Sequence, residues 1–138
     1  IIGDGEEKKM LQNYIERNNL NNCFLLGFKN NPYKYLVRSD LYISTSRWEE
    51  PGHTLLEAGY LNVPILSSDC PNGPNEIMHN KFNGLKYELG NKSDFMEKFQ
   101  EFINIDEGKK YSLSLNMKKS IINYTQFRFS KNFFKIFE

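Results

Sequence analysis

The chain has 138 residues, with 18 Lys and Arg against 17 Asp and Glu, so its net charge is close to zero. This balance excludes an electrostatic signature of a nucleic-acid or membrane partner, and the length suits one domain or a piece of one. The two cysteines, Cys23 and Cys70, are too few for a disulfide scaffold and suit a reducing cytoplasm. They form no metal-binding motif, and no run approaches about 18 apolar residues, so we expect no metal site and no membrane span.

Short apolar runs alternate along the chain with segments of helical periodicity. We expect strands at residues 1–2, 23–28, 40–45, 63–68 and 83–88, and helices at 6–17, 31–39, 54–60, 73–79 and 94–103, the last capped by Ser93. Strand and helix in alternation predict an α/β fold, a Rossmann-like, doubly wound parallel sheet with helices on both faces.

The end of the chain is expected to be helical from 108 to 138. Its tail, residues 127–138 with the sequence "FRFSKNFFKIFE", interleaves aromatic and basic side chains. We favour a helix that packs its aromatic side chains on the same protein over a helix that lies on a membrane surface.

Ligands of such a sheet bind outside the carboxyl ends of its strands. One loop there, residues 46–53 with the sequence "SRWEEPGH", leads into a predicted helix. The first amide groups of a helix form an anion site that suits phosphate, and Glu57, one turn inside, could accept hydrogen bonds from a ribose diol. Glu49, in the loop, could do the same for a sugar. The same spacing fits acids that favour the helix dipole and a solvated Glu57, and spacing alone leaves both interpretations open.

Residues 46–77, "SRWEEPGHTLLEAGYLNVPILSSDCPNGPNEI", closely resemble the donor-site signature of GT-B glycosyltransferases, particularly the retaining family 4, in which two glutamates are separated by seven residues. The segments "IIGDGEEKKMLQNYI", "NNCFLLGF", "NPYKYLVRSDLYISTS" and "KFNGLKY" also lie, in order, where that family has counterparts. The resemblance covers residues 1 to about 90, and it implies that residues 1–138 are the C-terminal, nucleotide-sugar-binding half of such an enzyme.

The resemblance implies transfer of a hexose from a nucleoside diphosphate sugar to an acceptor hydroxyl, with retention of configuration. Glu57 matches the glutamate that holds the nucleotide ribose. Glu49 matches the loop glutamate near the donor sugar and the reaction centre, and it is the candidate catalytic residue.

The remaining candidate site residues follow from the same resemblance. Pro51 and Gly52 match the positions whose backbone reaches the donor hexose, and His53 and Thr54 begin the amides that face the phosphates. Gly27 and Phe28 are placed where the family contacts the base. The resemblance implies no cofactor and no metal; the donor is a substrate, and uridine diphosphate is the expected nucleotide because it is the commonest in the family.

Two departures from the family pattern concern the loop and the start of the chain. Where the family has Glu-Gly-Phe-Gly, this chain has Glu49, Glu50, Pro51 and Gly52. Because proline has no backbone N–H, Pro51 removes one hydrogen-bond donor from the loop. The family's first strand and helix, which carry its basic diphosphate clamp, have no counterpart here, and Arg47 does not match the clamp.

These departures lead to expectations about the assembly. We expect an N-terminally truncated sheet, pairing between copies through the unpaired sheet edge, and no turnover by this chain alone, since the acceptor-binding domain is also absent. The resemblance implies a sugar or lipid-linked acceptor and a cytoplasmic protein, peripheral on the inner membrane face, in polysaccharide biosynthesis. The rival interpretations are a GT-B nucleotide-sugar epimerase and a non-catalytic Rossmann-like nucleotide-binding or regulatory domain.

Overall fold

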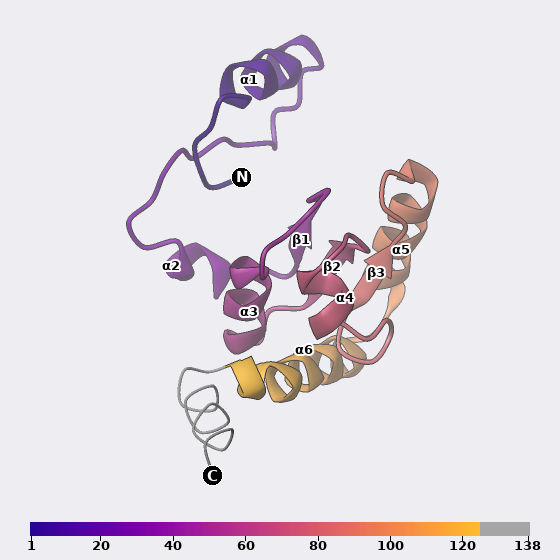
Figure 1. The fold of residues 1–138 in the computed structure, drawn as a ribbon. Coiled ribbons are helices and arrows are strands. Elements are labelled where there is room, and N and C mark those ends of the chain that lie inside the picture. The colour runs from indigo at the N-terminus through magenta and orange to yellow at the C-terminus, as the bar shows by residue number, and fades with distance from the viewer. Residues whose placement is uncertain (125–138) are drawn as a thin grey trace. The chain divides into compact units, whose positions relative to one another are not determined.

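The computed structural model describes residues 1–124, which divide into two units, Ile1–Lys34 and the described part of Tyr35–Glu138. Figure 1 shows the elements as a ribbon. In chain order they are α1 (Lys8–Arg17), α2 (Tyr33–Leu36), β1 (Tyr42–Ser44), α3 (His53–Tyr60), β2 (Ile65–Ser68), α4 (Gly73–Ile77), β3 (Leu85–Tyr87), α5 (Lys92–Asn104), α6 (Glu107–Ile121) and the 3-10 helix η1 (Ile122–Tyr124). The aromatic tail 127–138 lies outside the described residues.

The first unit contains α1 and two extended segments in place of the predicted strands 1–2 and 23–28. The segments share a few backbone hydrogen bonds, from Ile1 N to Phe24 O at 2.7 Å and from Leu26 N to Ile1 O at 2.8 Å, but neither is a strand. The side chains of Phe24 and Phe28 are 63% and 72% exposed. The prediction of strands here was wrong because an apolar run becomes a buried strand only where other elements cover it.

The second unit is built on a parallel sheet in the order β1-β2-β3. The register pairs Ile43 with Leu66 and Ser44 with Ser67 between the first two strands, and Leu66 with Leu85 between the last two. Helices α3 and α4 connect consecutive strands, as expected for parallel neighbours. The carboxyl ends of all three strands therefore lie at one edge of the sheet, followed by the loops that the sequence marks as candidates for binding.

Helices cover both faces of the sheet, which confirms the predicted α/β, doubly wound arrangement. Successive residues of a strand point to opposite faces, so β2 contributes Ile65 to one core and Leu66 to the other. The first core joins β2 to α3, α4 and α6; its buried members are Leu55, Ala58, Val63, Ile65, Ile77, Met78, Met117 and Ile121. The second joins β2 and β3 to α5; its buried members are Leu66, Leu85, Tyr87 and Phe102.

The start of α5 differs from the prediction. Asn91, and not Ser93, is the N-cap, and its side chain accepts a hydrogen bond from Asp94 N at 3.0 Å. The helical spacing is otherwise confirmed, because Phe95 and Phe99 pack against the core beside the buried Phe102. No helix among residues 1–124 is both long and apolar enough to cross a membrane.

Candidate functional site

The loop after β1 leads directly into α3, which begins one residue earlier than the sequence predicts. Gly52 is the N-cap, with φ 80° in the left-handed region that glycine adopts without strain. Its carbonyl oxygen accepts hydrogen bonds from Leu55 N at 3.0 Å and Leu56 N at 3.3 Å. The amides of His53 and Thr54 come before these bonds, so they have no acceptor within the helix. No side chain caps this end of the helix. These amides and the exposed side chains of His53 and Thr54 form the anion-compatible end of the candidate site.

The side chain of Glu49 is held by a short relay of serines at the ends of β1 and β2. Ser46 Oγ donates to Glu49 Oε1 at 2.6 Å, and Ser68 Oγ donates to the carbonyl oxygen of Ser46 at 2.5 Å. Ser68 is fully buried at the end of β2. The sheet therefore fixes the backbone of Ser46, and Ser46 in turn orients one oxygen of the half-buried Glu49 carboxylate. This relay was not predicted from the sequence.

Glu57 lies one turn inside α3 and is half-buried. Tyr42 is the residue that both glutamates influence. Burial raises the pKa of the Tyr42 phenol above its ordinary value of 10.0, and hydrogen bonding with Thr54 opposes this rise. The negative charges of Glu49 and Glu57 raise the same pKa further. The charges of both carboxylates therefore act on the same half-buried phenol. Sequence reasoning missed Tyr42; the available signal was that a buried tyrosine usually needs a partner for its hydroxyl.

The loop after β2 supports the loop after β1 through a contact between glycines. A Cβ on Gly73 would lie 3.1 Å from Pro51 O and 3.2 Å from Gly52 Cα, and a Cβ on Gly52 would lie 3.4 Å from Gly73 Cα. Both glycines are buried. Pro51 and Gly52, the predicted hexose-facing positions, therefore rest on the start of α4, and a side chain at position 73 would push them away.

Three other residues lie near the strand ends. Trp48 is 57% exposed. The carboxylate of Asp69 pairs with Lys86 Nζ at 2.8 Å because β2 and β3 end side by side. Cys70 is fully buried.

Gly27 and Phe28, the predicted base-contacting residues, belong to the first unit. Gly27 has φ 67°, and its carbonyl oxygen accepts a hydrogen bond from Gly3 N at 3.0 Å. Phe28 is largely exposed. Gly27 itself is half-buried, and its left-handed backbone is one that glycine adopts without strain.

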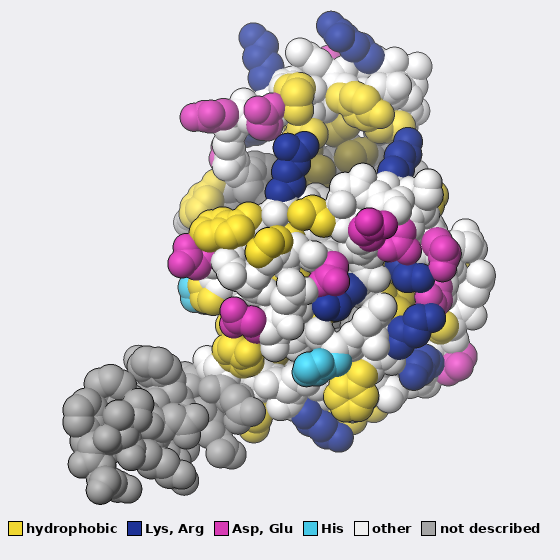
Figure 2. All heavy atoms as spheres, turned by 45° about the vertical axis from the view of Figure 1, so that its right-hand side comes forward, with side chains coloured by type: hydrophobic (Ala, Val, Ile, Leu, Met, Phe, Trp, Pro, Cys, Tyr) yellow, Lys and Arg dark blue, Asp and Glu magenta, His cyan; other side chains and the backbone are white. Residues whose placement is uncertain are grey.

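Charges of both signs are spread over the face of the molecule seen in Figure 2. In Figure 2, Lys and Arg side chains are interspersed with Asp and Glu side chains over the visible face. The described residues contain no group of three or more His, Cys, Asp or Glu that could hold a metal ion. Charge complementarity toward a diphosphate would therefore come from backbone amides and from single basic side chains.

A family model described as glycosyl transferases group 1 matches residues 1–132. The chain is 45% identical over 84 residues to an uncharacterized glycosyltransferase of Methanocaldococcus jannaschii, an alignment that covers 60% of this chain and 21% of that protein. It is 33% identical over 107 residues to the poly(ribitol-phosphate) alpha-N-acetylglucosaminyltransferase of Staphylococcus aureus, covering 77% of this chain and 22% of that one.

A solved structure gives the same result for the fold. S. aureus TarM, a variant of which was crystallised with fondaparinux, alpha-GlcNAc-glycerol and UDP, superposes with a TM-score of 0.89 at 26% identity, covering all of this chain and 28% of that one. The chain thus spans only about a fifth to a third of the length of these proteins. The fold matches the C-terminal, Rossmann-like half of GT-B glycosyltransferases, and the chain belongs to the glycosyl transferases group 1 family.

Proposed function

We propose that residues 1–138 form the donor-binding domain of a retaining glycosyltransferase that uses a UDP-linked hexose. The observation that carries the proposal is the placement of two glutamates next to the start of α3: Glu49 is held by Ser46 in the loop that leads into the helix, and Glu57 lies one turn inside it, behind the amides of His53 and Thr54. Family membership supports it, as does the UDP bound to a TarM variant.

The diphosphate of the donor is assigned to the start of α3. The amides of His53 and Thr54 carry the positive end of the helix dipole, and Gly52 has no side chain to shield them. An anion there would gain charge-assisted hydrogen bonds. During transfer the same amides would stabilise the leaving diphosphate as its negative charge grows, which is the electrostatic contribution that most favours a transition state.

The two glutamates are assigned to the two sugars of the donor. Glu57, one turn behind the amides, would accept hydrogen bonds from the ribose diol. Glu49, oriented by Ser46, would bind hydroxyls of the hexose next to the bond that breaks, with the backbone of Pro51 and Gly52 beside it. Gly27 and Phe28 are assigned to the uracil.

The family resemblance extends the proposal to the whole protein. We propose that an acceptor-binding domain like that of the longer relatives completes the enzyme, that residues 1–138 alone do not turn over, and that the acceptor is a sugar or lipid-linked saccharide in cytoplasmic polysaccharide or glycoconjugate synthesis. The terminal helices from 108 onward belong to the same domain in this proposal.

The test is isothermal titration of the chain with UDP, GDP and ADP, with Glu57→Ala as the variant. Loss of hydrogen bonds to a charged carboxylate should weaken UDP binding by about 1–3 kcal/mol. Alanine is the best helix former, so at this half-buried position it should change the free energy of unfolding by less than about 1 kcal/mol. Glu76→Ala is a matched control, because Glu76 is an exposed acid in the first turn of α4 and should bind UDP as the parent does. Equal affinity of Glu57→Ala and the parent chain for UDP would remove the ribose assignment.

A further inference from the structure

Two hollows lie on either side of the carboxyl end of β3, and they differ in how their charges are balanced. The larger, of about 870 Å³, is lined by residues of α4, β3 and α5. The smaller, of about 450 Å³, lies between the loop after β1 and the start of α5; it is lined by Thr45, Arg47, Tyr87, Leu89, Gly90, Asn91, Lys92 and Phe95.

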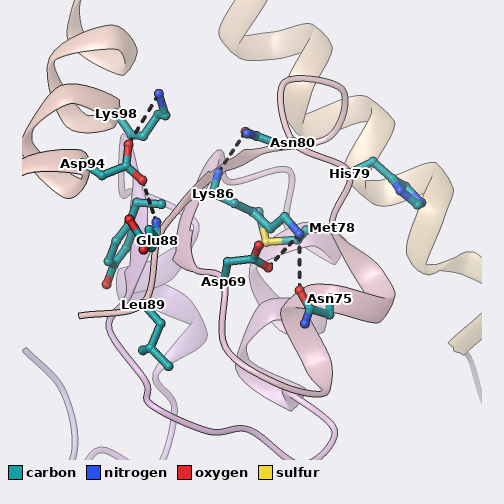
Figure 3. Close-up of a pocket in the computed structure, with 11 residues that line it drawn as sticks. Asp69, Asn75, Met78, His79, Asn80, Lys86, Glu88, Leu89, Asp94 and Lys98 are labelled. Atoms are coloured by element: carbon teal, nitrogen blue, oxygen red, sulfur yellow. Dashed lines mark hydrogen bonds and ion pairs between the residues drawn. The ribbon is translucent and has the colours of Figure 1, made fainter. Parts of the chain in front are cut away.

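In the larger hollow the basic side chains already have acidic or polar partners. Lys86 Nζ lies 2.8 Å from an oxygen of Asp69 and 3.5 Å from Asn75 Oδ1. Lys98 Nζ lies 3.6 Å from an oxygen of Asp94. Figure 3 shows both ammonium groups directed at these partners. A ligand here would have to displace existing pairs, so the larger hollow offers an anion little net attraction.

In the smaller hollow the basic side chains are unpaired among the described residues. Its two basic side chains, Arg47 and Lys92, are exposed, and neither has a hydrogen-bond or ion-pair partner among residues 1–124. No carboxylate lines the hollow. The nearby Glu88 is engaged by Asn91 Nδ2 at 2.7 Å, and Asp94 accepts the amide of Glu88 at 2.6 Å and lines the other hollow. Two unpaired cations therefore share one depression.

The floor of the smaller hollow is rigid and apolar. Tyr87 is 7% exposed and donates its hydroxyl hydrogen bond to Ser44 O at 3.3 Å. Its ring packs edge-on against Phe95 at 5.1 Å between centroids, and Phe95 stacks on Phe99. An anion held by Arg47 and Lys92 could thus keep its carbon portion against an aromatic floor, and the arginine fork suits the oxygens of a phosphate.

We propose that this hollow, formed by Arg47, Lys92, Tyr87 and Phe95, is a binding site for a phosphate ester, separate from the phosphate site at the start of α3. The proposal deepens the proposed function, because both substrates of a glycosyltransferase can bring phosphate: the donor through its diphosphate and the acceptor through a phosphate of its own. The evidence for the anion-binding site, namely the two unpaired cations and the cavity, does not depend on that function.

The experiment is an amide NMR titration of the full chain with glycerol 3-phosphate and with UDP, at constant ionic strength. Glycerol 3-phosphate should shift the amides of Arg47, Gly90 and Lys92 in a saturable way. Arg47→Gln combined with Lys92→Gln should weaken this binding by about tenfold or more, since two charge-assisted contacts are lost.

The matched control is Lys109→Gln with Lys119→Gln, which removes the same charge from two exposed lysines of α6. It should weaken glycerol 3-phosphate binding less than about twofold, as expected for charges screened beyond a Debye length. Equal weakening by the two double variants, or shifts spread over exposed lysines with no saturation, would overturn the site.

The UDP arm distinguishes the two sources of phosphate. If UDP shifts the amides of α3 while glycerol 3-phosphate still binds the hollow at unchanged affinity, the hollow serves the acceptor. If UDP shifts the amides of the hollow and displaces glycerol 3-phosphate, the hollow holds the donor diphosphate, and the proposal of a site separate from the start of α3 is overturned. Binding of glycerol 3-phosphate at the hollow with no UDP binding anywhere would support the site and contradict the proposed donor function, so the two failures are separable.

Discussion

Helix α3 has two faces that the protein uses for different purposes. On one face Leu55, Ala58 and Gly59 are buried against β2 and α6. On the other, His53 and Thr54 are exposed and Glu57 is half-buried. The helix is only eight residues long, so each substitution on it tests whether its effects on stability and on ligand binding can be separated.

The largest expected effect comes from the buried face. Leu55 is fully buried, and Leu55→Ala should lower the free energy of unfolding by about 2–5 kcal/mol, because it removes apolar contacts and leaves a cavity. Urea denaturation followed by circular dichroism measures this. Tyr60→Ala, on the exposed side of the same helix, should cost less than about 1 kcal/mol. If Leu55→Ala lowered the free energy of unfolding by less than Tyr60→Ala does, the description of α3 as having one buried and one exposed face would be wrong.

A second substitution tests how closely α3 and α6 approach. A Cβ on Gly59 would lie 2.8 Å from Met117 Cγ and 3.2 Å from Ile121 Cδ1. Gly59→Ala gains about 1 kcal/mol of helix propensity, but overpacking costs about 1–3 kcal/mol, so we expect a net loss of about 1 kcal/mol in the unfolding free energy.

Gly5→Ala is the control for this substitution, because a Cβ on Gly5 would meet nothing within 4 Å. The same urea titration should find its unfolding midpoint unchanged. If Gly59→Ala proves as stable as the parent chain, Met117 moves aside at no cost, and the contact between α3 and α6 is looser than the distances indicate.

The sequence predicts α3 and the candidate residues at its start better than it predicts the side chains that support them. Helical spacing indicates a helix at 54–60, and the motif around it names Thr54 and Glu57, because both signals are local in the chain. The Ser46 relay and Tyr42 were missed, since Ser68 comes from β2 and Thr54 from α3, and no spacing rule joins residues of different elements. The failed strand at 23–28 has the converse cause: its composition is right, but none of its side chains is more than half-buried among the described residues.

The exposed face can be tested through the support of Glu49. Ser46→Ala removes the 2.6 Å hydrogen bond to Glu49 Oε1 without touching α3. If Glu49 binds the hexose, the variant should keep its affinity for UDP but lose about 1 kcal/mol of the extra affinity that the sugar gives. The measurement is a calorimetric comparison of UDP with whichever UDP-hexose binds more tightly.

The control for this prediction is Ser93→Ala, which changes an exposed serine in the first turn of α5. It should leave both affinities unchanged. Equal losses for UDP and UDP-hexose in Ser46→Ala would show that the loop as a whole had moved, and would remove the separate role of Glu49.

The smallest effect is expected at Tyr42, whose ring packs against the core under α3 while its pKa responds to Thr54 and to the charges of Glu49 and Glu57. Burial, followed by the charges of Glu49 and Glu57, raises the pKa of Tyr42 above its ordinary value of 10.0. The folded state therefore holds this proton more tightly than the unfolded state, so the associated stability is complete below pH 10 and is lost as the pH rises through the folded pKa. The unfolding free energy of the parent chain should fall more steeply between pH 9 and pH 11 than that of Tyr42→Phe, in urea titrations at several pH values. Parallel curves would mean that the phenol is solvated and that the two carboxylates do not act on it. That result would contradict the placement of Glu49 and Glu57 around one phenol, and with it part of the support for the donor site.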